Sequence, residues 1–273
     1  MLNLLKAEFM KLRRCQILLV GFVALALCPV VQYGSQLIVA PEYRDANYDF
    51  AHLFENVVWG NSQIFLPISL VMIGAWLIDR ESADDTLKNI LTVPVAMPKL
   101  LGAKLTLMGL LALFFGLYSA VFSLITGVLV GLDGLTAALF IKSAAQITAA
   151  ALTTYIVCMP LILLFGQMRG AYLGGSILAF FMGYSILFFK NGALASVYPF
   201  SAALVVVGFD MSEYVGKAAA RSMLLALFGL GLMLLFSALL LLLSGREREM
   251  KAPRRKSGKG AGKRRSARNG ALR

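Results

Sequence analysis

Charged residues, histidine and cysteine are all scarce in this sequence. Charged residues make up 15% of the 273 positions, whereas soluble domains contain about 25%. The single histidine, His52, leaves little room for His-based catalysis or a His-rich metal site, and we expect the chain to bind no metal. Cys15, Cys28 and Cys158 form neither a CxxC pair nor a disulfide framework. These shortages point away from a soluble domain.

Hydrophobic residues, by contrast, are abundant and arranged in long runs. They make up 59% of the chain, and the mean hydropathy is +0.78. A helix that crosses a bilayer needs about 20 mostly apolar residues. The runs of suitable length are 17–39, 57–78, 105–130, 143–165, 172–189 and 223–243. The sequence therefore predicts an all-α membrane protein with six transmembrane helices, of which the second is interrupted near its start by Asn61, Ser62 and Gln63.

The positive charge indicates how these helices are oriented. Cytoplasmic loops retain Lys and Arg, and with both termini inside, the inner segments hold 21 of the 26 Lys and Arg residues. Residues 244–273 contribute twelve basic and two acidic residues, which is +10 of the total charge of +12. Without this tail the inner segments still hold nine basic residues against five outside. The sequence favours an N-in, C-in topology.

The basic C-terminal residues form a segment of their own. We divide the chain into a transmembrane domain over residues 1–245 and a cytoplasmic tail over residues 246–273. The tail is rich in Gly and has no apolar periodicity, so we expect it to be disordered. It has no aromatic residue on which a base stacks, and we expect no nucleic acid partner. Attraction to anionic membrane lipids and plain solvated disorder are equally compatible with its composition.

Two shorter segments outside the long runs have a recognisable pattern. Residues 2–12 have the periodicity of an interfacial helix on the inner membrane surface, and an ordinary basic anchor before the first span is the alternative. The apolar face consists of Leu2, Leu5, Phe9 and Leu12, and the polar face of Lys6, Glu8, Lys11 and Arg13. Residues 197–209 are apolar but too short to cross, so we expect a re-entrant or interfacial segment.

The inner loop over residues 79–104 carries the most informative pattern. Ser82 and Asp85 have the spacing of a capping box, which starts a helix at residue 83. Leu87, Ile90 and Leu91 then form an apolar helix face. A capped helix with such a face suggests a docking surface for another protein, and a helix that lies on the lipid headgroups is the alternative.

This loop resembles that of a known family. Residues 81–95 read ESADDTLKNILTVPV and resemble the cytoplasmic loop of ABC-2-type transporter permeases. Residues 4–12, LLKAEFMKL, resemble the start of the small permeases of antimicrobial-peptide (lantibiotic) immunity and bacitracin-type efflux systems. Span number and topology over residues 1–245 are similar too. Asp85 and Met97 depart from the pattern, which usually has Gly at the first position and often has Arg at the second.

The resemblance implies a transporter permease that works with other subunits in the bacterial plasma membrane. Residues 83–91 would be a coupling helix that docks on a separate ABC ATPase subunit. The coupling residues would be Glu81, Asp84, Asp85, Thr86, Leu87, Lys88, Ile90 and Leu91. A second permease subunit, identical or different, would complete a dimer. The cargo would be a hydrophobic or amphipathic substrate such as an antimicrobial peptide.

The sequence has no nucleotide-binding motif of its own. The nearest match, SGKGAGKR at 257–264, lacks the leading Gly and the Mg-binding hydroxyl of a P-loop. We therefore expect the chain to be no enzyme and to bind no cofactor, with ATP and Mg on the partner ATPase.

Polar residues inside the predicted spans are few. Gln146, Thr148, Thr153 and Thr154 are possible pathway residues, and hydrogen bonding within the bundle is the alternative. No carboxylate lies near the middle of a span, which argues against an ion-coupled secondary transporter. A non-transporting polytopic membrane scaffold would explain the spans equally well.

Overall fold

The computed structural model describes residues 2–12, 15–40, 47–83, 97–189, 193–215 and 222–251. All regular secondary structure in these residues is helical, and no strand occurs among them. The elements are α1 (Leu2–Leu12), α2 (Ile17–Ile38), α3 (Phe50–Gly60), the π-helical turn η2 (Asn61–Phe65), α4 (Leu66–Ala83), α6 (Met97–Val130), α7 (Ala137–Gly166), α8 (Tyr172–Tyr184), the 3-10 turn η3 (Ser185–Phe188), α9 (Ala193–Val197), α10 (Pro199–Val206), α11 (Ser212–Val215) and α12 (Met223–Lys251).

Five helices are long and apolar enough to cross a bilayer. They are α2, the continuous helix from Phe50 to Arg80, α6 from Pro98, α7, and α12 as far as Ser244. The second of these begins at Phe50, seven residues before the predicted span at 57–78. The polar residues at 61–63 do not interrupt this helix, because they form part of a π turn within it. The predicted run at 172–189 forms the shorter apolar helix Tyr172–Phe188. The all-helical class is confirmed with five candidate spans, and the sixth depends on this shorter helix.

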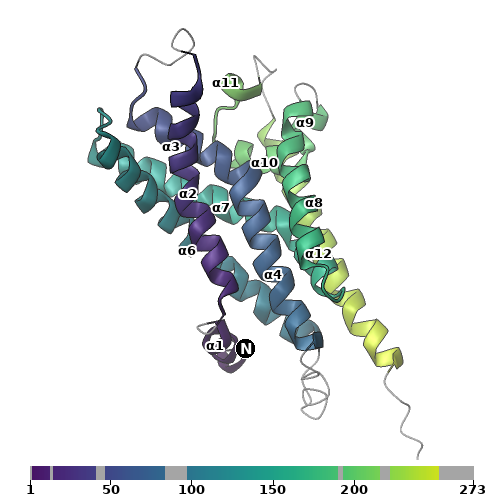
Figure 1. The fold of residues 1–273 in the computed structure, drawn as a ribbon. Coiled ribbons are helices and arrows are strands. Elements are labelled where there is room, and N and C mark those ends of the chain that lie inside the picture. The colour runs from purple at the N-terminus through teal and green to yellow at the C-terminus, as the bar shows by residue number, and fades with distance from the viewer. Residues whose placement is uncertain are drawn as a thin grey trace, which may run out of the picture.

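The helices form one bundle, and the chain alternates in direction through α2, the helix over α3 and α4, α6, α7, the shorter α8 and α12 (Figure 1). Figure 1 shows α1 and the C-terminal part of α12 at one end, and α9, α10 and α11 at the other. We call these the basal end and the far end. The helix over α3 and α4 and the helix α7 are central, since 72% and 61% of their most apolar stretches are buried. For α2 and α12 the value is 22%, so these two helices lie at the periphery.

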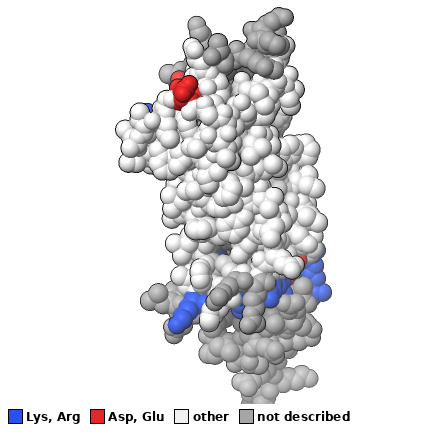
Figure 2. Space-filling view, turned by 60° about the vertical axis from the view of Figure 1, so that its left-hand side comes forward, with Lys and Arg blue, Asp and Glu red and all other residues white. Residues whose placement is uncertain are grey.

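Basic side chains gather at the basal end, as Figure 2 shows. Among the lysines and arginines whose side chains are described, only Lys142 lies outside this end. The basal ones are Lys6, Lys11, Arg80, Lys99, Lys104 and Arg169. The two ends of the bundle therefore differ in charge.

Helix α1 has the predicted bounds, and one residue of its polar face is buried in the bundle. Leu12 and Glu8 are buried and Leu5 is half-buried, whereas Phe9 is 66% exposed. Glu8, which the periodicity places on the polar face, is thus buried against the bundle. The physical reason is that α1 packs on α6, where Lys104 provides a partner for the Glu8 carboxylate.

The short apolar segment predicted at 197–209 lies inside the bundle. It forms α10 after a break at Tyr198 and Pro199, and Pro199 occupies the first turn of α10, where its missing N–H is not needed. Phe200 and Leu204 are buried, and α10 packs against α7 and α12. This packing fixes the broken segment at the far end.

Helix α12 continues beyond the predicted end of the transmembrane domain. It ends at Lys251, so the first six residues of the predicted tail, 246–251, are helical. Residues 252–273 lie outside the described residues.

Candidate functional site

A buried ion pair joins α1 to α6 at the basal end. A Glu8 carboxylate oxygen lies 3.1 Å from Nζ of Lys104, and the other lies 2.6 Å from Nζ of Lys11. Glu8 and Lys104 are 2% and 3% exposed, whereas Lys11 is 48% exposed. Burial raises the pKa of Glu8, but the two lysines outweigh burial and hold this pKa below its ordinary value of 4.5. Glu8 is therefore ionised at neutral pH, and the pair attaches α1 to the bundle.

Lys104 reaches α4 as well. Its Nζ donates a hydrogen bond of 2.6 Å to the backbone carbonyl of Leu77, near the end of α4. One ammonium group thus connects α1, α4 and α6. Because a buried charge is costly without its partners, these three helices are stabilised as a unit.

Two further residues tie the end of α4 to its neighbours. Asp79 is buried, and its Oδ2 accepts a 3.0 Å hydrogen bond from the N–H of Gly170 in the α7–α8 turn. Arg80 donates to Sγ of Cys15 at 3.1 Å, between α1 and α2, and its guanidinium lies 5.4 Å from the ring centre of Trp76. We name these residues together the basal clamp. It consists of Glu8, Leu77, Asp79, Arg80 and Lys104.

The basal clamp borders the predicted coupling segment. Helix α4 ends at Ala83 and α6 begins at Met97, so residues 84–96 connect the two helices that Lys104 joins. Glu81 lies in the last turn of α4. The other predicted coupling residues lie outside the described residues. They are Asp84, Asp85, Thr86, Leu87, Lys88, Ile90 and Leu91.

A π turn places polar groups within the bundle. In η2, Nδ2 of Asn61 donates to Oγ of Ser119 at 2.7 Å. Within the described part of the chain, Oδ1 of Asn61, Oγ of Ser62 and Nε2 of Gln63 are buried without a hydrogen-bond partner. The turn packs against α2, α7, α8 and α10. Since π turns often mark functional sites and buried unpaired polar groups are costly, η2 is a second candidate site.

The predicted pathway residues of α7 do not converge on one site. Thr148 and Thr153 donate to carbonyls one turn earlier in their own helix, and Thr153 also donates to the carbonyl of Ala203 in α10. Gln146 donates at 3.5 Å to a carbonyl just after α10. Thr154 is buried, and its hydroxyl has no partner among the described residues. Hydrogen bonds inside the bundle thus account for three of the four, and a pathway role stays a prediction.

The far end is held together by aromatic stacking and hydrogen bonds. Trp59 stacks on Tyr214 with ring centres 4.5 Å apart, and the Tyr214 hydroxyl donates to Oδ1 of Asn56 at 2.7 Å. Asp49 caps α3 by accepting from the N–H of His52 at 3.0 Å, and lies 2.8 Å from Nδ1 of the same residue. In the described ranges, no three His, Cys, Asp or Glu residues gather as metal ligands would.

Comparison with known proteins identifies the family. Residues 4–186 match the family described as ABC-2 family transporter protein, which is about two thirds of the chain. The chain belongs to the ABC-2 transporter family. The matched region contains both the basal clamp and the π turn, and ends before α9 and α12.

A curated relative of this ABC-2 protein is the bacitracin transport permease protein BCRB of Bacillus licheniformis. The two are 28% identical over 124 residues, a stretch that covers 44% of this chain and 58% of the relative. The chain therefore spans little more than half the length of that relative. No solved structure matches it significantly. With its family and its apolar helices, this ABC-2 protein is a multi-pass protein of the bacterial plasma membrane.

Sequence reasoning missed the basal clamp of this ABC-2 protein. The periodicity of residues 2–12 places Glu8 on a polar helix face, and the charge pattern identifies Lys104 only as inner positive charge. The available signal was a lysine followed by an apolar run, because a charge that enters a span needs an opposite partner. The signal for the π turn was the run of polar residues at 61–63 inside an otherwise apolar stretch.

Proposed function

We propose that this chain is the membrane permease subunit of an ABC transporter and that a separate ATPase subunit drives it. The basal clamp carries the proposal, because Lys104 joins the two helices that flank residues 84–96 to each other and to α1. A force on that segment would move α1, α4 and α6 together instead of bending one of them. Membership of the ABC-2 family supports the ATPase partner.

The coupling helix is proposed at residues 83–91, which begin at the last residue of α4 and continue into the segment between α4 and α6. Leu87, Ile90 and Leu91 would bury against the ATPase, and Glu81 and Lys88 would orient it. A second permease subunit, identical or different, would complete the working dimer. ATP and Mg would bind to the ATPase and not to this chain.

We also propose six spans with both termini in the cytoplasm. The helix Tyr172–Phe188 has 17 residues, and a rise of 1.5 Å per residue makes it about 25 Å long. This length is close to the hydrocarbon core of about 30 Å. Gathering of Lys and Arg at the basal end supports a cytoplasmic location for that end.

ATPase copurification tests the proposal. Tagged full-length chain, extracted from its native membrane in mild detergent, is expected to bring down an ATPase subunit. The double variant Leu87→Asp, Ile90→Asp is expected to lose it. Leu135→Asp is the matched control, because Leu135 is an exposed apolar residue of the loop at the far end. Absence of any ATPase with the wild-type chain would favour a membrane scaffold, and unchanged association in the double variant would overturn the coupling helix.

The proposed cargo is a hydrophobic or amphipathic peptide that is moved across or out of the membrane. The relative's name, a bacitracin transport permease, supports a peptide antibiotic. A strain that lacks this chain is expected to become more sensitive to bacitracin or to another antimicrobial peptide, and the wild-type chain should restore resistance. Unchanged sensitivity across a broad peptide panel would exclude this cargo class while leaving the ATPase experiment unaffected.

A further inference from the structure

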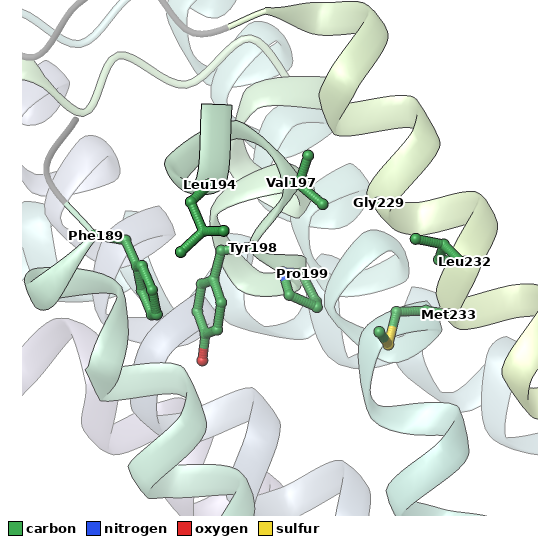
Figure 3. A pocket seen from close by; sticks show the side chains of 8 residues that line it. All are labelled: Phe189, Leu194, Val197, Tyr198, Pro199, Gly229, Leu232 and Met233. Carbon is green, nitrogen blue, oxygen red and sulfur yellow. The ribbon is translucent and has the colours of Figure 1, made fainter. Parts of the chain in front are cut away.

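A pocket of about 250 Å³ lies at the far end between α12 and the broken segment that follows α8. Figure 3 shows Phe189 and Tyr198 on one side of it and Leu232 and Met233 of α12 on the other, with Leu194 above. Its α12 wall lies beyond the region that matches the ABC-2 family. The pocket is thus separate from the basal clamp and from the predicted coupling segment.

Tyr198 presents only its ring to this pocket. Its hydroxyl donates to the carbonyl of Met182 and lies 2.6 Å from Oγ of Ser185, so its polar atom is used by α8 and η3. The ring stacks on Phe189 with ring centres 4.3 Å apart and an angle of 22° between the planes. These contacts fix one wall of the pocket.

The opposite wall depends on a close approach at Gly229. A Cβ atom at this position would lie 2.5 Å from the carbonyl oxygen of Val197. Only glycine lets α12 come this close to the end of α9. This close approach sets the spacing of α12 and the end of α9 beside the pocket.

The chemistry of the walls restricts the occupant. The side chains around the space are aliphatic, aromatic or thioether, and the one hydroxyl is already hydrogen-bonded. A peptide backbone or a sugar placed here would lose its hydrogen bonds to water without replacement, which is costly. A hydrocarbon chain carries no such groups.

The pocket borders an exposed apolar surface that includes part of the candidate span α12. Leu194 is 68% exposed and Leu232 is 42% exposed, and Leu235, one turn further along the candidate span α12, is 70% exposed. Phospholipid chains surround such a surface in large excess, so by mass action they reach the pocket before rarer molecules do. Their gain is packing contact, because bilayer and pocket are equally apolar.

We propose that this pocket binds one acyl chain of a bilayer phospholipid, from the leaflet at the far end. The bound chain lies between α12 and the α9–α10 break, against the ring of Tyr198 and beside the close approach at Gly229. This site does not depend on the proposed ATPase partner or peptide cargo.

Photolabelling tests the proposal. The full-length chain in nanodiscs of phosphatidylglycerol that carries a diazirine within one acyl chain is irradiated, digested and mapped by mass spectrometry. Labelling is expected to concentrate on Leu194 and Met233. The cavity-filling variant Leu232→Trp is expected to lower labelling of Met233 about tenfold, the factor that corresponds to about 1.4 kcal/mol. Leu235→Trp, on the exposed face of the same helix, is the matched control and should leave it unchanged.

Other outcomes would overturn the site. Even labelling along α12, or labelling of Met233 that survives Leu232→Trp, would mean that lipid only covers the surface. Loss of labelling on addition of an antimicrobial peptide would assign the pocket to cargo, and efficient disulfide formation between two Leu194→Cys chains would assign it to a second copy. Should Leu232→Trp not fold, the wild-type chain gives the decision: a specific site labels Met233 several-fold more than Leu235, whereas surface coverage labels the more exposed Leu235 at least as much.

Discussion

The buried charges of Glu8 and Lys104 make the attachment of α1 depend on both residues at once. Lys104→Met leaves the Glu8 carboxylate buried without its buried partner, and Glu8→Met does the same to the Lys104 ammonium. We expect each single variant to lower the free energy of unfolding by about 3 kcal/mol or more. The double variant holds neither charge, so its loss should be smaller than the sum of the two. Unfolding in mixed micelles with increasing dodecyl sulfate measures these free energies.

Lys99→Met provides the control for this pair. Lys99 lies in the first turn of the same helix but is exposed, so its removal should change the free energy of unfolding by at most about 0.5 kcal/mol. Strictly additive losses for Glu8→Met and Lys104→Met would contradict the interaction.

The same carboxylate predicts how stability changes with pH. The pKa of Glu8 is lower in the folded protein than its ordinary value of 4.5, because Lys104 and Lys11 outweigh burial. Glu8 therefore binds protons more readily in the unfolded chain, and its contribution is present above pH 4.5 and lost as the pH falls through the folded pKa. The midpoint of detergent-induced unfolding should fall on acidification in the wild type. The fall should be smaller in Glu8→Gln, and an identical pH profile would contradict the prediction.

At the scale of elements, the π turn and α8 pack closely against each other at one glycine. A Cβ atom at Gly183 of α8 would lie 2.1 Å from the carbonyl oxygen of Gln63 in η2. Gly183→Ala must push α8 away from the centre of the bundle, and we expect it to cost about 1–3 kcal/mol of folding free energy. Gly174→Ala is the matched control in the same helix, since nothing lies within 4 Å of its added Cβ. It should be neutral or stabilise by up to about 1 kcal/mol, and equal effects of the two changes would refute the close approach.

Helices α1 and α2 and the π turn differ in how well the sequence predicts them. The bounds of α1 and the start of α2 agree with the apolar periodicity, because a long apolar run needs no distant partner to become a helix in a membrane. The burial of Glu8 in α1 was not predictable in this way. Glu8 and Lys104 are 96 positions apart, and only packing of α1 on α6 brings them together. The π turn also depends on its neighbours, since its backbone fits against Gly183.

At the scale of the whole molecule, composition predicted the class and the uneven charge of the two ends. It did not decide the number of crossings, because Tyr172–Phe188 lies at the lower limit of the length that a span needs. The burial of α10 was also missed. Its length excluded a crossing, but its packing against α7 and α12 comes from elements distant in sequence.

Cysteine labelling of intact cells decides the number of crossings. In a background with Cys15, Cys28 and Cys158 replaced by Ala, single cysteines are placed at Asp133, Met168 and Ser212, which are exposed in the α6–α7 loop, the α7–α8 turn and α11. A membrane-impermeant maleimide should label Asp133→Cys and Ser212→Cys from outside, because α7 and α8 each cross once between these sites. Met168→Cys should react only after permeabilisation, at the cytoplasmic end that Lys and Arg mark. If Ser212→Cys instead behaves like Met168→Cys, α8 does not cross and the chain has five spans, whereas reaction of Met168→Cys alone from outside would reverse the orientation.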